Sequence, residues 1–307
     1  MSTALLRRGA ISGVRSAAVA ALAFATALGG AVAAHADAPG HKGFVVNVKL
    51  SASGVVEAPD EHPGGTVTFR VATDDPNGRQ LQIFRPHAGV TIDQVLKDLG
   101  NAVSQDPPTA AAGITAVTNE AEALGGALTT PSIPMIVTED IKPGPIYLLD
   151  FTAFLAHPTT PPPVKEIDLC EDAGFHIPHF PHEIVIQKDT PDGPRFQTEN
   201  VDSAGGAFFV HNAATELHEM QIQPVVPGTT DDQIQAYFNA IASGQTPPPS
   251  PFTGLPVGLG AISPNHDAVV HADKLPPGDY ALLCFIPDDK TGVPHAFLGM
   301  HKVVHLA

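Results

Sequence analysis

The stretch Pro276-Pro277-Gly278-Asp279-Tyr280-Ala281-Leu282-Leu283-Cys284 is followed by ten further residues, by His295 and, after four more residues, by Met300. Its Pro-Gly turn introduces an apolar run, which is typical of a buried strand. Residues 287–292 have the composition of a turn, so the chain is expected to leave this strand, reverse and return as the last strand. A thiol, an imidazole and a thioether therefore come from one loop at the end of one strand.

A metal site built on this loop needs a second histidine, and His218 is the best candidate. It follows Asn212 by six residues, at a point between two strand-like runs. Soft sulfur ligands combined with imidazole suit copper, and two histidines and one cysteine with a weak axial methionine form a blue-copper site. The sequence predicts a mononuclear copper site whose ligands are His218, Cys284, His295 and Met300.

With these residues identified, the part of the chain from roughly 195 to 307 resembles the cupredoxins, the plastocyanin-like blue-copper domains, and their secreted actinobacterial relatives. In that family the first histidine follows a strand end that contains an asparagine, and the cysteine, second histidine and methionine lie on the last loop. Asn212 and the four predicted ligands match this order, although the spacing from cysteine to histidine is longer than in plastocyanin. The resemblance implies a Greek-key β-sandwich that transfers electrons or binds copper.

The two halves of the chain also resemble each other. Residues 89–95 correspond to residues 228–234, and 81–83 correspond to 220–222, with the same offset of 139 residues. A repeat of this length indicates two tandem copies of one domain. Residues 182–186 also correspond to residues 301–305, which predicts that each segment is the last strand of its copy. The boundary between the two copies then falls at 188–194, a segment of linker composition.

The predicted organisation is thus a leader at 1–36, a degenerate cupredoxin-like domain at 37–190 and a cupredoxin-like domain with the copper site at 191–307. The 31 prolines and 28 glycines favour many turns and short strands, so the expected class is all-β, with two tandem Greek-key sandwiches. Two short helical insertions are predicted at 96–103 and 235–242, with Thr91 and Thr230 as N-caps.

The same alignment predicts that the first copy lacks the copper site. Asp150 takes the position of Cys284, Arg79 that of His218, Pro181 that of Met300, and His176 that of His295. His176, His179 and His182 are separated by prolines that exclude a helix. They either form an exposed histidine-rich loop or supply an extra metal site.

Cys284 and Cys170 are the only cysteines, and three interpretations of Cys284 remain open. It is a copper ligand, a disulfide partner of Cys170, or a free buried thiol. A disulfide would join non-equivalent positions of the two copies and requires their Cα atoms to lie within about 7 Å.

The N-terminus has the features of a signal peptide. Arg7, Arg8 and Arg15 precede an apolar run, and Ala34-His35-Ala36 fits a cleavage site, so we expect an exported, soluble protein. Cleavage would lower the formal net charge from −16 to −19, which opposes binding to nucleic acid or anionic lipid. This acidity serves solubility alone or attracts cations and basic partners. No later stretch is long and apolar enough to predict membrane insertion.

The sequence contains no Gly-x-Ser-x-Gly elbow, no phosphate-binding glycine loop, no His-Glu-x-x-His motif and none of the paired His-x-His motifs of multicopper oxidases. The sequence therefore indicates an exported copper protein for electron transfer or copper binding, with an unidentified redox partner. The alternatives are a metal-free extracellular binding or structural module, and a copper-dependent oxidoreductase.

Overall fold

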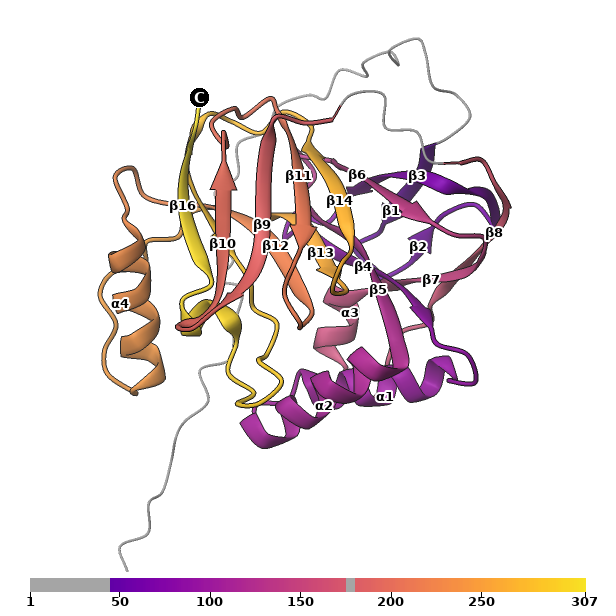
Figure 1. Ribbon diagram of the computed structural model, residues 1–307, viewed down its shortest axis with the longest axis horizontal. Coiled ribbons are helices and arrows are strands. Elements are labelled where there is room, and N and C mark those ends of the chain that lie inside the picture. The colour runs from indigo at the N-terminus through magenta and orange to yellow at the C-terminus, as the bar shows by residue number, and fades with distance from the viewer. Residues whose placement is uncertain (1–44, 175–179) are drawn as a thin grey trace, which may run out of the picture.

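A computed structural model describes residues 45–174 and 180–307 (Figure 1). The predicted leader at 1–36 and two residues of the histidine-rich segment, His176 and His179, lie outside these residues. Strands dominate the described chain and a few helices lie at its periphery, so the expectation of a mainly β protein is confirmed. The strands, in chain order, are β1 (Val45–Leu50), β2 (Val56–Glu57), β3 (Glu61–Thr73), β4 (Arg79–Pro86), β5 (Ala121–Thr129), β6 (Met135–Ile141), β7 (Gly144–Asp150), β8 (Lys165–Asp172), β9 (Glu183–Thr190), β10 (Gly193–Glu199), β11 (Ala207–Asn212), β12 (His218–Pro224), β13 (Val257–Ile262), β14 (Asp267–Ala272), β15 (Gly278–Leu283) and β16 (His301–Leu306).

One pattern of strand pairing occurs twice along the chain. In the first half β3 pairs parallel with β1 and antiparallel with β6, while β4, β5, β7 and β8 pair antiparallel in the order β5-β4-β7-β8. In the second half β11 pairs parallel with β9 and antiparallel with β14, and the other strands pair in the order β13-β12-β15-β16. Each half therefore contributes one set of strands to each of two sheets, which β3 joins by also pairing parallel with β8.

The pairing corrects the alignment of the two last strands. β8 pairs with β7 as β16 pairs with β15, whereas β9 pairs with β10 and β11. The counterpart of the loop that carries His295 and Met300 is therefore 151–164, between β7 and β8, so Pro181 and His176 are not the counterparts of Met300 and His295. A boundary at 190 would separate β9 from its partner β11, and the division into two domains remains a prediction.

The two halves are joined by hydrogen-bonded strands as well as by packing. β14 pairs with β6 in one sheet, and β13 pairs with β5 in the other, both antiparallel. The main apolar core contains side chains of both sheets and both halves, among them Phe69, Leu81, Phe208 and Leu259. Both sheets therefore run from one half into the other, and the core lies between them.

The helices α1 (Ile92–Ala102) and α4 (Asp231–Ala242) confirm the two predicted insertions. Thr91 and Thr230 cap them as expected, and Gln233 completes a capping box with Thr230. Two further helices were not predicted, α2 (Pro107–Glu120) and α3 (Phe151–Ala156). The pair Pro107-Pro108 begins α2, because prolines are well tolerated in a first turn, and Asp106 caps the helix there.

Candidate metal centre

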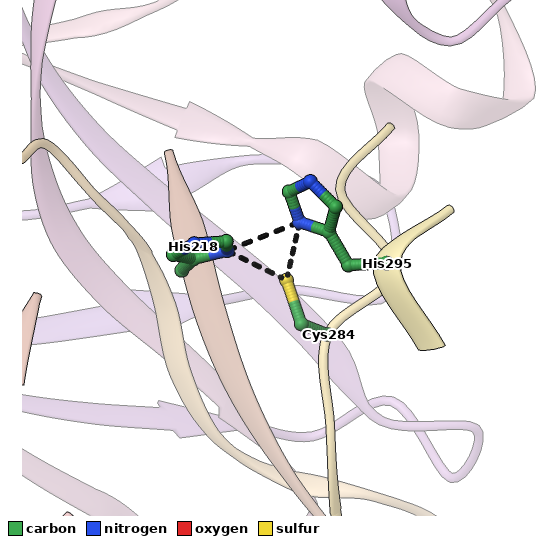
Figure 2. Close-up of side chains that lie close together, drawn as sticks. All are labelled: His218, Cys284 and His295. Carbon is green, nitrogen blue, oxygen red and sulfur yellow. Dashed lines mark hydrogen bonds between the residues drawn. The ribbon is translucent and has the colours of Figure 1, made fainter. Parts of the chain in front are cut away.

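The four predicted ligands come from two places in the second half. His218 is the first residue of β12, and Cys284 directly follows β15, which pairs with β12. His295 begins a short 3-10 helix, η1 (His295–Leu298), and Met300 lies between η1 and β16. Figure 2 shows His218, Cys284 and His295 pointing toward one another.

Asn212 shapes the segment that leads to His218. Its side-chain N–H group donates to the carbonyls of Glu216 and Ile262, and its side-chain oxygen accepts the N–H of Ala214. Because Asn212 is fully buried at the end of β11, these bonds fix the turn between β11 and β12. The asparagine that supported the family resemblance thus has a structural role beside the site.

The long loop after Cys284 is closed by backbone hydrogen bonds. The N–H of Ala296 donates to the carbonyl of Cys284 at 2.7 Å, and the N–H of His295 donates to that of Ile286 at 3.0 Å. The N–H of Met300 in turn donates to the carbonyl of His295 at 2.9 Å. The extra residues form a turn outside these contacts, so His295 still returns to Cys284 despite the long spacing.

Three ligand atoms meet at distances that suit a metal ion. The Nδ1 atoms of His218 and His295 are 3.0 Å apart, and Cys284 Sγ lies 3.7 Å from the former and 3.5 Å from the latter. A point about 2 Å from all three atoms lies between them, and metal–imidazole and metal–thiolate bonds are roughly 2.0–2.3 Å long. The donor set and its spacing therefore fit a trigonal copper ion.

Met300 completes the buried cluster. Like the other three residues it has no exposed surface, and its side chain belongs to the same apolar cluster as that of Cys284. It reaches this position after Gly299, whose left-handed backbone (φ 98°) ends η1. The cluster of two histidines, a cysteine and a methionine resembles a type 1 copper site.

Burial determines the protonation of the cluster in the absence of a metal. Desolvation, assisted by the neighbouring His295, lowers the pKa of His218 to about 3, so its imidazole is neutral at pH 7. Desolvation and then Glu219 raise the pKa of Cys284 well above its usual range, so this side chain is a thiol. A metal ion that binds here must therefore displace the thiol proton.

Two carboxylates beside the cluster were not identified from the sequence. Glu216 Oε2 accepts a hydrogen bond from His295 Nε2 at 3.2 Å, and Glu219 Oε1 accepts the N–H of Phe285 at 2.9 Å. Burial alone would raise the pKa of Glu216, but the hydrogen bonds from His295 and the Asp289 N–H outweigh it and hold the pKa at about 2. The only sequence signal was their place next to His218, which is too general to assign a contact.

In the first half an ion pair occupies the equivalent place. Arg79 begins β4 as His218 begins β12, and Asp150 ends β7 at the position of Cys284. Arg79 Nη1 lies 3.0 Å from the fully buried carboxylate of Asp150, and Arg79 Nε lies 2.8 Å from Asp75. The arginine and aspartate predicted at these positions thus contact each other.

The two cysteines are free thiols and do not form a disulfide. Cys284 is buried in the cluster, whereas Cys170 is exposed on β8. Of the predicted histidine-rich loop, His182 is described, and its side chain is exposed. No helix of the described residues is long and apolar enough to cross a membrane.

Comparisons with known proteins yield structural similarity only. No protein-family model matches the sequence, and no curated protein matches it. Auracyanin B is similar over 43% of this chain and 93% of its own, with 17% identity and a TM-score of 0.24. The copper-containing nitrite reductase of Thermus scotoductus is similar over 86% of this chain and 61% of its own, with 11% identity and a TM-score of 0.23. The copper nitrite reductase of Nitrosomonas europaea is similar over 87% of this chain and 94% of its own, with 12% identity and a TM-score of 0.22.

Proposed function

We propose that this chain is an exported cupredoxin-like protein that binds one copper ion. Its function would be either to transfer electrons through this ion or simply to bind copper. His218, Cys284 and His295 would hold the ion, with Met300 as a weak axial ligand. The observation that carries the proposal is the meeting of two imidazole nitrogens and one sulfur at 3.0–3.7 Å in a fully buried site. The repeated strand pairing and the order of the ligands support two Greek-key sandwiches, of which the second carries the site.

Copper bound by such ligands supplies a one-electron couple. The residues of this chain hold the donor atoms rigidly, because His218 lies on a strand and His295 is tied by its backbone to Cys284 and Ile286. They also exclude water, because α2 of the first half covers the loop after Cys284. Ile286 packs against an apolar cluster that includes Ile114 and Val117 of α2, and the hydroxyl of Thr115 donates to the carbonyl of Asp289.

The direct test is copper loading of the purified full-length chain. We expect one copper per chain and an intense visible absorption from thiolate-to-copper charge transfer, which Cys284→Ser abolishes and Cys170→Ser, the matched control, leaves unchanged. A colourless chain with no stoichiometric copper would instead support a metal-free module. One observation favours that second candidate: the His218–His295 contact of 3.0 Å allows a direct hydrogen bond without a metal.

Partners and location remain parts of the proposal. We propose an unidentified redox protein as partner, no binding to nucleic acid and no membrane insertion. A copper-dependent oxidoreductase is the alternative, and an assay for turnover of a small oxidisable or reducible substrate separates the two. Export would be checked by mass spectrometry of the secreted protein, in which we expect residues 1–36 to be absent.

A further inference from the structure

The hydrogen bond between Glu216 and His295 constrains which nitrogen of this histidine carries a proton. Oε2 of Glu216 lies 3.2 Å from Nε2 of His295, and the Glu216 side chain is only 11% exposed. An ionised carboxylate can only accept, so Nε2 must carry the hydrogen. In neutral His295 the lone pair is then on Nδ1, the atom that faces Cys284 and His218.

We propose that Glu216 is a positioning residue that fixes His295 in the metal-binding tautomer and stabilises the oxidised form of the copper site. This inference rests on the proposed function. A carboxylate hydrogen-bonded to a histidine ligand increases the basicity of that ligand. The charges favour the same direction: the Cys284 thiolate and the Glu216 carboxylate would offset the two charges of Cu(II), whereas with Cu(I) they would leave one excess negative charge, which the 76% exposed Lys290 balances only in part.

Glu216 also contacts the loop itself, which offers a purely structural explanation. Its Oε2 accepts the N–H of Asp289 at 2.9 Å, and Lys290 Nζ lies 3.7 Å from its Oε1. The turn has a separate support, however, because Asp288 Oδ1 accepts the N–H of Thr291 at 2.7 Å and that of Lys290 at 3.1 Å. A loss of Glu216 charge should therefore leave the turn formed, and the two roles can be separated.

The first experiment needs no metal. Nitrogen NMR of the metal-free, full-length chain should show His295 with its proton on Nε2, and Glu216→Gln should shift the ring toward a mixture of tautomers. Asp189→Asn is the matched control, because the Asp189 carboxylate accepts hydrogen bonds from Thr215, the neighbour of Glu216, and not from His295. An Nδ1–H tautomer in the wild type, or an identical tautomer in Glu216→Gln, would overturn the positioning role.

The second experiment measures the affinities for Cu(II) and Cu(I) and the reduction potential. For Glu216→Gln we expect a loss of roughly tenfold or more in Cu(II) affinity, the usual cost of removing such a partner, and a smaller loss in Cu(I) affinity. A tenfold fall in the ratio of Cu(II) affinity to Cu(I) affinity raises the reduction potential by about 59 mV. Asp189→Asn should leave the potential unchanged.

If Glu216→Gln does not fold, the change in reduction potential of a second variant still tests the inference. Lys290→Gln removes the cation that faces Glu216, so the potential should fall, by less than Glu216→Gln raises it because Lys290 is 76% exposed. Equal losses of both copper affinities in Glu216→Gln, or a rise in potential with Lys290→Gln, would contradict the inference alone. A wild-type chain that binds no copper refutes the proposed function, and the tautomer measurement then still decides the role of Glu216.

Discussion

Replacing Asp150 by Asn tests whether a buried ion pair stands in for metal ligands in the first half. Asp150 is fully buried, and its Oδ2 lies 3.0 Å from Nη1 of Arg79. Its other oxygen accepts the N–H of Ala153 at 2.9 Å and so caps α3. Asparagine has nearly the same size and its oxygen can keep the cap, so the substitution removes the charge and little else.

The expected magnitude follows from desolvation. Burial raises the pKa of Asp150, and the Ala153 N–H and the Arg79 guanidinium offset this only in part, so the charge of Asp150 itself adds no stability. The cost of Asp150→Asn comes from Arg79, which is 9% exposed and loses one of its two carboxylates; a buried charge left with no partner costs about 3–5 kcal/mol. Arg79 keeps its contact of 2.8 Å with Asp75, so we expect a loss below that range, about 1–2 kcal/mol.

Urea denaturation at pH 7 measures this change in the free energy of unfolding. The control is Asp168→Asn, an exposed position on β8, which should change stability by less than about 0.5 kcal/mol. Copper stoichiometry should stay at one per chain in both variants, because neither touches the cluster around Cys284. A loss of less than about 1 kcal/mol for Asp150→Asn would refute the reasoning that Arg79 depends on this carboxylate.

Three further predictions concern other parts of the chain. Burial, with Glu122 and Asp267 nearby, raises the pKa of Glu139 to about 8, so the folded chain keeps a proton there that the unfolded chain loses above about pH 4.5. The free energy of unfolding should therefore fall as the pH rises between these values, by at most about 1.4 kcal/mol per pH unit. Denaturation curves measured across this range should lose that slope in Glu139→Gln. Cys170→Ser should leave the free energy of unfolding unchanged, because Cys170 is a free thiol. A loss of about 2–4 kcal/mol in that free energy would instead indicate that Cys170 forms a disulfide. Gly292→Ala should lower the free energy of unfolding by at least about 1 kcal/mol more than Gly228→Ala does. Both glycines have a positive φ, but only at Gly292 would a Cβ clash with the carbonyl of Pro107. Equal losses in the two variants would show that the structure relieves the clash.

The sequence was most informative where the relevant interactions are local. Thr91 and Thr230 cap their helices through the next turn, so the residues that decide each helix start are adjacent in the chain. Cys284, His295 and Met300 come from one strand-loop-strand segment, and their order alone suggested a common site. The contact of His218 with them was harder to foresee, because it depends on the pairing of β12 with β15.

The sequence was less informative where a local pattern has two structural solutions. Helix α2 was not predicted, because Pro107-Pro108 suits a loop after α1 as well as the first turn of another helix, and the cap by Asp106 decides for the beginning of α2. The apolar pattern of 183–186 suits a last strand or a first strand, and only the parallel pairing with β11 decides between them. The Glu216–His295 bond joins residues 79 positions apart and has no signal in the sequence.

The first half is part of the surroundings of the candidate metal centre even though it supplies none of the four candidate ligands. Gln80 of β4 donates to Glu219, which in turn accepts the N–H of Phe285, the residue after Cys284. α2 lies against the loop that precedes His295, where the backbone of Gly292 leaves no room for a Cβ beside Pro107. A fragment beginning at 191 would lack these contacts and β9, the partner of β11. Because these contacts help to keep the site dry and its donor atoms fixed, we expect the proposed copper site to require the whole described chain.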